Sequence, residues 1–411
     1  MTTETLAAIA LFILAFGLIS KPIEKSVITP PMVFTIFGLL LSPQLLGLLN
    51  VNIKSEIVLL FAEFTLILVL FTDVSRIHLK LLFQEYDLPL RLLGIGLPVM
   101  IILGTFGANI FFQQELTIWE AAALATILAP TDAALGQAVV SSPRVPLCIR
   151  QSLNVESGLN DGICLPILLI FLSLATSQTA AAEATSYWLS FSAKQVILGP
   201  IVGIAVGYIG GWLLLVSSDR RWITESFRDL SVLGLSLLAY TLAEIIGGNG
   251  FISAFCAGLT LGNTARFLIL LTFMIYGAIM VLPALPELTW QIVFYAIVSL
   301  LIVRSASVAI STIGMKLRGE TLVFLGWFGP RGVASVLYGL LVLEETAIQG
   351  SSVIFTTMVI TVLISIFAHG ITAFLGANWY GDRIDQLEAK QPELPELKSV
   401  REMPVRLPWN Q

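Results

Sequence analysis

Long apolar segments alternate with short polar loops along this chain, and that pattern limits its possible folds more than any other feature. Apolar runs of about 17 to 25 residues, the length of a membrane-spanning helix, recur about thirteen times along the sequence. Only 12% of the residues are charged, and the mean hydropathy of +0.91 lies outside the range of ordinary soluble domains. We therefore predict an all-α polytopic membrane protein with about thirteen transmembrane helices.

The predicted spans are centred near residues 12, 40, 65, 99, 130, 162, 205, 236, 256, 276, 302, 333 and 364. The Gly-rich stretch GGNGFISAFCAGLTLGN around residue 256 fits either a full span or a short re-entrant helix. No Lys or Arg precedes the first apolar run, at roughly residues 5 to 20, so it lacks the basic region of a cleaved signal peptide. We expect it to be retained as the first helix.

Basic residues set the expected orientation, because cytoplasmic loops carry most of the Lys and Arg of a membrane protein. With the N-terminus outside, the loops on the cytoplasmic side hold most basic residues, and the opposite loops hold only Lys54 and Lys194. This predicts a membrane domain over residues 1–377 and a short, polar, disordered cytoplasmic tail over residues 378–411. A net charge of −5 without a basic run indicates no nucleic-acid partner.

Two spans are interrupted in the same manner about 200 residues apart. ATILAPTDAALGQAV has Pro130 in the middle of one span, and GWFGPRGVASVLYG has Pro330 in the middle of another. Paired interruptions are typical of transporters built from two inverted-topology repeats, whose binding site lies where the broken helices cross. The alternative is that each proline only kinks its helix, which is common in membranes.

Each interruption carries one charge of the sign that its helix ends require. A broken helix leaves positive amide ends and negative carbonyl ends in a medium without bulk water. The negative charge of Asp132 can compensate the amide ends, and the positive charge of Arg331 can compensate the carbonyl ends. We assign both residues to helix-dipole compensation.

The costliest residues of the chain lie together in LNVESGLNDG, within a predicted span. Ser157, Asn160 and Asp161 share one helix face by their i, i+3, i+4 spacing, and Glu156 lies beside Asn160. Such oxygen groups, with Thr131 from the first interruption, suit a hard cation. Because burial disfavours the charged carboxylate, a proton can compete with the cation for Asp161. The alternative is that Asp161 only makes a helix-packing hydrogen bond.

Other charges within the spans need partners as well. Arg304 must meet a carboxylate, and Glu156 is the preferred one. Asp73 ends the third span and fits either a polar element of the ion path or an interfacial ion pair; Glu63 and Glu244 have no assigned role. The two histidines, His78 and His369, are too few and too scattered for a metal site.

The stretch LAPTDAALGQAVVSSPRVPLCIRQSLNVESGLNDG resembles the bacterial sodium/proton antiporters of the NhaP type, in the monovalent cation/proton antiporter superfamily. LFTDVSRIHL, LAEIIGGNGFISAFCAGLTLGN and GWFGPRGVASVLYG are similar to further stretches of that family, so the resemblance covers most of the membrane domain. It implies a transporter, not an enzyme, without a cofactor, that exchanges Na⁺ or Li⁺ for H⁺ and supports pH homeostasis.

The resemblance also implies roles for single residues. Asp161 would bind the cation or the proton, with Ser157 and Thr131 as further Na⁺ ligands, and Asp73 would lie on the cytoplasmic approach. Asn160 stands where electrogenic relatives carry a second aspartate, which implies electroneutral exchange. Further implied features are a bracing Glu156–Arg304 ion pair, helix-end charges at Asp132 and Arg331, and a homodimer whose mobile core moves like an elevator. Ser305 departs from the family, since many relatives have proline there.

Three alternatives stay open from the sequence. A K⁺/H⁺ antiporter of the same fold differs only in ligand geometry. A cation channel or an intramembrane aspartate hydrolase fits less well, because the chain has neither a filter-like repeat nor a second catalytic aspartate motif. The short tail and the lack of a transit peptide favour the plasma membrane of a bacterium, where the partners would be the cation, the proton and membrane lipid.

Overall fold

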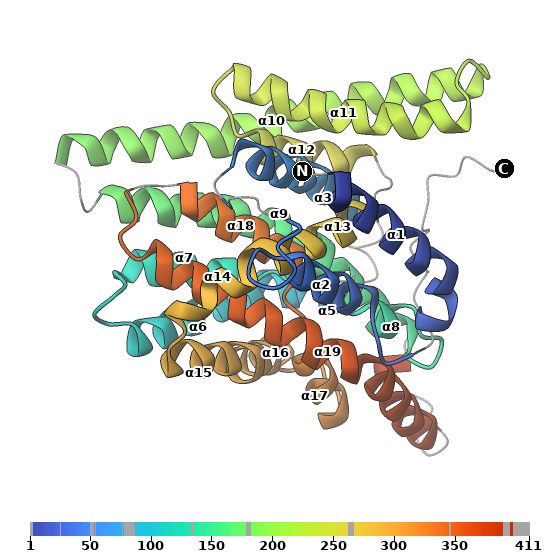
Figure 1. Cartoon of the computed structure of the whole chain (residues 1–411). Coiled ribbons are helices and arrows are strands. Elements are labelled where there is room, and N and C mark those ends of the chain that lie inside the picture. The colour runs from blue at the N-terminus through green and yellow to red at the C-terminus, as the bar shows by residue number, and fades with distance from the viewer. Residues whose placement is uncertain are drawn as a thin grey trace.

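The structure, a computed structural model, describes residues 3–24, 26–49, 53, 55–75, 77, 87–132, 135–177, 182–261, 267–344, 347–388 and 395–397. The regular structure of these residues is entirely helical, and no strand occurs among them. Figure 1 shows the helices stacked in layers around α9, which crosses the middle of the molecule. The prediction of an all-α protein is confirmed.

The first part of the chain forms α1 (Thr3–Glu24), α2 (Pro30–Leu41), α3 (Glu56–Val74), α5 (Asp87–Arg91), the π-helical segment η1 (Leu92–Gly96), α6 (Leu97–Phe111), α7 (Ile118–Ile127), α8 (Gln137–Val140) and α9 (Leu147–Ser177). The second part forms α10 (Ala182–Asp219), α11 (Glu225–Ile245), α12 (Gly250–Leu261), α13 (Phe267–Tyr276), η2 (Gly277–Val281), α14 (Leu282–Ala284), η3 (Leu285–Glu287), α15 (Trp290–Val298), η4 (Ser299–Val303), α16 (Arg304–Ser311), α17 (Gly319–Trp327), α18 (Val333–Glu344), α19 (Ser351–Glu388) and η5 (Pro395–Leu397).

Helices of membrane-spanning length dominate the described residues. Seven are long and apolar enough to cross a bilayer, and five further apolar helices or helix segments have 10–17 residues. Large apolar side chains point outward along α1 and α10, as a lipid-facing surface requires; Leu18 is 78% exposed and Trp212 is 58% exposed. In Figure 1, α10 and α11 run side by side along the top of the molecule. These features are those of a multi-pass membrane protein.

The two predicted interruptions are present, and they meet in space. The first separates α7 from α8, and the second separates α17 from α18. The backbone amide of Asp132, in the first, donates a 2.8 Å hydrogen bond to the carbonyl of Pro330, in the second. Non-helical backbone is tolerated at membrane depth where protein groups satisfy it, and here each interruption satisfies the other.

The expected boundary at residue 377, between the membrane domain and a polar tail, lies within a helix. Helix α19 continues through residue 377 as far as Glu388. Beyond it, η5 packs back onto the protein, and Glu396 is fully buried. Its Oε1 accepts hydrogen bonds from the backbone amide of Arg318 at 2.8 Å and the hydroxyl of Thr321 at 2.9 Å. Because Arg318 is the N-cap position of α17, the carboxylate satisfies helix-end donors, which orders this part of the tail.

Candidate functional site

The polar face predicted for residues 157–161 is present on α9, and neighbouring helices bury it. Ser157 is 5%, Asn160 1% and Asp161 4% exposed. The helix packs against α3, α7, α10 and α12, so this face is enclosed by other helices. Uncompensated polar groups at this depth are costly, and their presence points to partners or a ligand.

Thr131 connects this face to the first interruption. The hydroxyl of Ser157 donates to the backbone carbonyl of Thr131 at 2.5 Å, and the amide of Asn160 donates to the Thr131 hydroxyl at 2.8 Å. Thr131 can present a carbonyl here because the helix is broken at this position, so its carbonyl has no partner within a helix. Asp161 follows Ser157 by one helical turn, on the same face. The structure thus brings together Asp161, Ser157, Asn160 and Thr131.

A cavity of about 10 Å³ adjoins this cluster. It is lined by groups from both interruptions and from α9, among them Thr131, Asp132, Ser157 and Pro330. That volume admits about one water-sized particle. The cavity can therefore hold one small cation or water beside oxygen atoms of Thr131, Asp132 and Ser157, whereas Asp161 and Asn160 are not among its lining residues. No group of three His, Cys, Asp or Glu side chains suited to a metal occurs in the described part of the chain.

Glu156 and Arg304 form a buried ion pair next to the cluster. The guanidinium of Arg304, at the start of α16, bonds both carboxylate oxygens of Glu156, and the Nη2–Oε2 distance is 2.8 Å. Their side chains are 2% and 3% exposed. Gly329 of the second interruption packs on the same guanidinium, because a Cβ there would lie 2.5 Å from Arg304 Nε. The pair therefore joins α9 to the second interruption.

Of the two charges of the interruptions, Asp132 faces a helix end and Arg331 faces the backbone of its own interruption. Asp132 Oδ2 accepts a 3.0 Å hydrogen bond from the amide of Val333, the first residue of α18. Arg331 is fully buried, and its Nη1 donates at 2.8 Å to the carbonyl of Gly329. Gly332 lets Asp132 approach, since a Cβ at that position would lie 2.0 Å from the carboxylate. Asp132 thus meets an amide at the start of α18, whereas the carbonyl that Arg331 meets lies two residues after the end of α17, and helix-dipole compensation stays a prediction for both.

Of the remaining acidic positions, Glu63 and Glu244 lie at a separate cavity, and Asp73 is described only by its backbone. Asp73 is in the last turn of α3, but its side chain is outside the described part of the structure, as is His78. Glu63 accepts a hydrogen bond from the hydroxyl of Tyr240. Glu244 accepts one from the amide of Gly250 at 2.7 Å. Both line a separate cavity of about 270 Å³ between α3, α11, α12 and α18.

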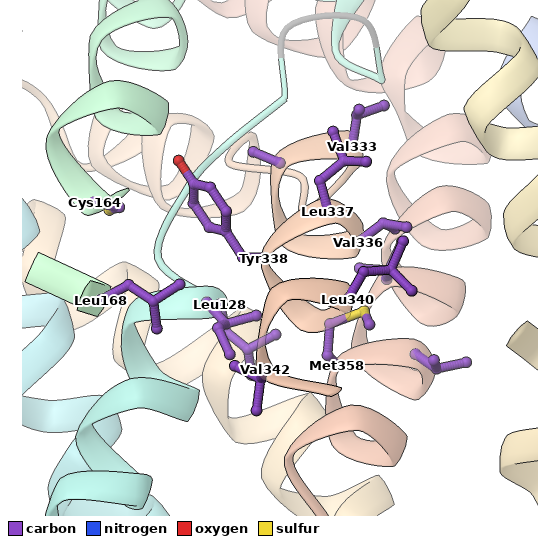
Figure 2. Close-up of a cluster of buried hydrophobic side chains, with 14 of the residues drawn as sticks. Leu128, Cys164, Leu168, Val333, Val336, Leu337, Tyr338, Leu340, Val342 and Met358 are labelled. Atoms are coloured by element: carbon purple, nitrogen blue, oxygen red, sulfur yellow. The ribbon is translucent and has the colours of Figure 1, made fainter. Parts of the chain in front are cut away.

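Tyr338 is a site residue that the sequence analysis missed. Its hydroxyl donates to the backbone carbonyl of Asp161, and the side chain is fully buried. Figure 2 shows the ring projecting from α18 toward α9, where Cys164 lies. The only sequence signal was its place in GWFGPRGVASVLYG, two helical turns after the second interruption. A tyrosine on an otherwise apolar helix needs a partner for its hydroxyl, which could have drawn attention to it.

Comparisons with known proteins give a consistent picture. The family described as "Sodium/hydrogen exchanger, transmembrane" matches residues 7–379. A probable Na⁺/H⁺ antiporter of Schizosaccharomyces pombe is 26% identical over 62% of this chain and 37% of its own length. The K⁺/H⁺ antiporter NhaP2 of Shewanella oneidensis is 22% identical over 78% of this chain and 56% of its own length. The chain thus spans only about a third to somewhat over half of these relatives.

Among solved structures, the sodium proton antiporter MjNhaP1 from Methanocaldococcus jannaschii at pH 8 has a similar fold. The TM-score is 0.74 at 20% sequence identity, and the match covers 92% of this chain and 99% of that one. At this identity the likeness establishes the fold, and the architecture predicted from the paired interruptions is that of an antiporter.

Proposed function

The chain belongs to the transmembrane sodium/hydrogen exchanger family, and we propose that it is a secondary antiporter that exchanges Na⁺ for H⁺ by alternating access. One observation carries the proposal. Asp161 shares a buried helix face with Ser157 and Asn160, and both of these bind Thr131 where two broken helices cross. Crossed broken helices with an intramembrane carboxylate are the arrangement that secondary transporters use for ions.

In this proposal the cation and the proton use the same carboxylate in turn. Asp161, Ser157 and Thr131 supply oxygen ligands to Na⁺. Hard monovalent cations prefer oxygen ligands. Asn160 Oδ1 is buried without a hydrogen-bond partner among the described residues, so its oxygen is available beside them. When the cation leaves, Asp161 takes a proton, because a bare carboxylate is disfavoured in the membrane interior. Competition for one carboxylate obliges the two fluxes to be coupled.

Exchange should be electroneutral, one cation for one proton. Asn160 occupies the position of a possible second carboxylate, and an amide does not titrate. Asp161 is therefore the single titrating ligand of the cluster. The transported ions are the cargo, and the proposal involves no cofactor.

The other charged residues have supporting roles in this proposal. Glu156 and Arg304 brace α9 against the second interruption, and Asp132 and Arg331 compensate the helix ends. Asp73, at the end of α3, is proposed to lie on the cytoplasmic approach of the cation. None of these five side chains needs to change its charge during transport.

We place the protein in the plasma membrane of a bacterium, with the N-terminus outside, the C-terminus in the cytoplasm, and pH homeostasis as its role. The excess of basic residues in alternate loops supports this orientation. The outward apolar side chains of α1 and α10 support contact with lipid and with a second copy in a homodimer.

K⁺ is the second candidate cation, because one of the relatives is named a K⁺/H⁺ antiporter. The ligand atoms alone do not separate the two ions, since both are hard cations that oxygen ligands bind.

Transport into proteoliposomes tests the proposal. The purified chain would be reconstituted with an internal pH-sensitive dye, and Na⁺, Li⁺ or K⁺ added in turn, with and without valinomycin and K⁺ to clamp the voltage. We expect cation-driven proton flux that ignores the clamp. Conductance without proton coupling would indicate a channel, and no proton flux with any of the three cations would reject the antiporter.

A further inference from the structure

Two side chains of α19 bridge the interruption between α17 and α18. Ser365 and His369 lie one helical turn apart, so their side chains project from the same face of α19. They are 0% and 1% exposed. His369 takes no part in the proposed exchange, so its burial in the membrane interior needs another explanation.

Each end of the interruption is bonded to this Ser–His pair. His369 Nε2 lies 2.9 Å from the carbonyl of Trp327, the last residue of α17. The backbone amide of Arg331, two residues before α18, donates to Ser365 Oγ at 2.7 Å. Ser365 Oγ in turn lies 3.1 Å from His369 Nδ1, which is also 3.0 Å from the Ser365 carbonyl. The pair therefore spans the gap that the broken helix leaves.

The partners assign the protons of this pair. The carbonyl of Trp327 can only accept, so Nε2 carries a proton. The Ser365 hydroxyl accepts from Arg331 N–H and keeps its own proton, which it can donate to Nδ1. Burying a charged ring is costly, and this neutral tautomer avoids that cost while it keeps the bonds from Nε2 to Trp327 and from the Ser365 hydroxyl to Nδ1. The 3.0 Å approach of Nδ1 to the Ser365 carbonyl is then a contact without a shared proton. His369 is thus a fixed donor and acceptor.

The bonded chain continues to the candidate cation ligand. Arg331 follows Pro330, whose carbonyl accepts the amide of Asp132 from the first interruption at 2.8 Å. Asp132 directly follows Thr131, which meets Ser157 and Asn160. A displacement of the backbone in the second interruption would therefore also displace Thr131.

We propose that His369 and Ser365 are positioning residues for the cation site, which fix the second interruption so that the crossed backbone holds Thr131 against α9. This rests on the proposed function for its effect on transport, but not for its effect on the backbone. The rival explanation is local packing. Trp327 stacks on the His369 ring at 4.9 Å between centroids and donates to Thr372 at 2.8 Å, so the end of α17 is also held without the Ser–His bonds.

The first test measures hydrogen exchange of the full chain in detergent, in peptides that contain the two interruptions. The variants are His369→Leu and Ser365→Ala. Thr361→Ala is the matched control, because Thr361 has a buried hydroxyl on α19 whose bond among the described residues is to the Thr357 carbonyl of the same helix. Losing one hydrogen bond should speed exchange of the Asp132 and Arg331 amides roughly tenfold in both variants and leave the control unchanged. Unchanged exchange at Asp132 would overturn the proposal.

The second test separates positioning from general stability by transport kinetics. We expect His369→Leu and Ser365→Ala to raise the KM for Na⁺ by about tenfold, with the maximal rate per folded protein retained. His369→Gln places an amide donor near Nε2 and should recover part of the wild-type KM. A lower maximal rate with unchanged KM would mean that the pair only supports folding, and would overturn the proposal.

The two tests also distinguish this inference from the proposed function. If the wild-type chain exchanges neither Na⁺, Li⁺ nor K⁺ for protons, the antiporter fails, and hydrogen exchange still decides whether the Ser–His pair fixes the crossed interruptions. If His369→Leu does not fold, Ser365→Ala and His369→Gln decide both tests.

Discussion

In the interruption between α7 and α8, Thr131 turns its carbonyl and its hydroxyl toward α9, whereas in the interruption between α17 and α18 Arg331 turns its guanidinium back onto Gly329. The polar groups of the first interruption thus lie at the candidate cation site. Those of the second are bonded by its own backbone, by Asp132 of the first interruption and by α19. The two interruptions therefore have different parts in the proposed mechanism. The first would supply ligands to the cation, and the second would hold the backbone geometry of those ligands.

The ion pair between Glu156 and Arg304 joins these two regions, and breaking it should have the largest effect. Replacing Arg304 by Met leaves a buried carboxylate without its partner, which costs on the order of 3–5 kcal/mol of unfolding free energy. Denaturant or thermal unfolding of the purified protein would measure it. The double variant Glu156→Leu with Arg304→Met should lose less unfolding free energy than Arg304→Met alone. An equal or larger loss would mean that the ion pair does not connect α9 to the second interruption.

Asp132, from the first interruption, bonds the amide of Val333 at the end of the second, and its removal should have the next largest effect. Asp132→Asn keeps the shape but weakens a charge-assisted bond to the amide of Val333, with an expected loss of about 1.5–3 kcal/mol of stability. Asp382→Asn is the control, because that carboxylate is 59% exposed. Equal stability of the two variants would contradict the role of Asp132 at the start of α18.

The variant Thr131→Val tests whether the Thr131 hydroxyl is a ligand of the cation. Loss of the hydroxyl should raise the KM for Na⁺ about three- to tenfold, which corresponds to one hydrogen-bonding group. It should also cost about 1–3 kcal/mol of stability, because the buried amide of Asn160 loses its acceptor. Thr131→Ser keeps the hydroxyl and should stay near the wild type. The transport assay described above measures both variants. A wild-type KM in Thr131→Val would place the ligand elsewhere and remove the functional difference between the two interruptions.

The smallest change in stability is expected at an exposed contact between α19 and the loop that precedes α9. Arg144 Nη2 lies 2.5 Å from Asp382 Oδ1, but the two side chains are 43% and 59% exposed. Solvent and salt screen such pairs, so Arg144→Ala should cost about 0.2–1 kcal/mol and even less at high salt. A loss as large as that of Arg304→Met would show that burial does not set the strength of these pairs here.

The features that sequence reasoning found are those in which a charge or a proline interrupts an apolar span. Arg304 in a membrane segment requires a carboxylate, and Glu156 is indeed its partner. Pro130 and Pro330 mark the interruptions, and the i, i+3, i+4 spacing places Ser157, Asn160 and Asp161 on one face. Each of these inferences depends on local spacing or on the cost of a lone charge, which the sequence displays directly.

The features that sequence reasoning missed depend on which helices pack together. Tyr338 and Ser365 look like ordinary members of apolar helices, and only the packing of α18 on α9 and of α19 on the second interruption gives them partners. Glu396 looks like part of a polar tail, but it becomes a buried cap once η5 lies against α17. These contacts join residues that are far apart in the chain, so no local sequence pattern predicts them.

The most direct test of the account is proton release on cation binding, measured with a pH dye in weakly buffered detergent solution. If one carboxylate holds either a cation or a proton, Na⁺ added to the protonated wild-type chain should release about one proton for each Na⁺ bound. Asp161→Asn should release none. Equal proton release from wild type and Asp161→Asn would contradict the central claim, because another group would then be exchanging its proton for the cation.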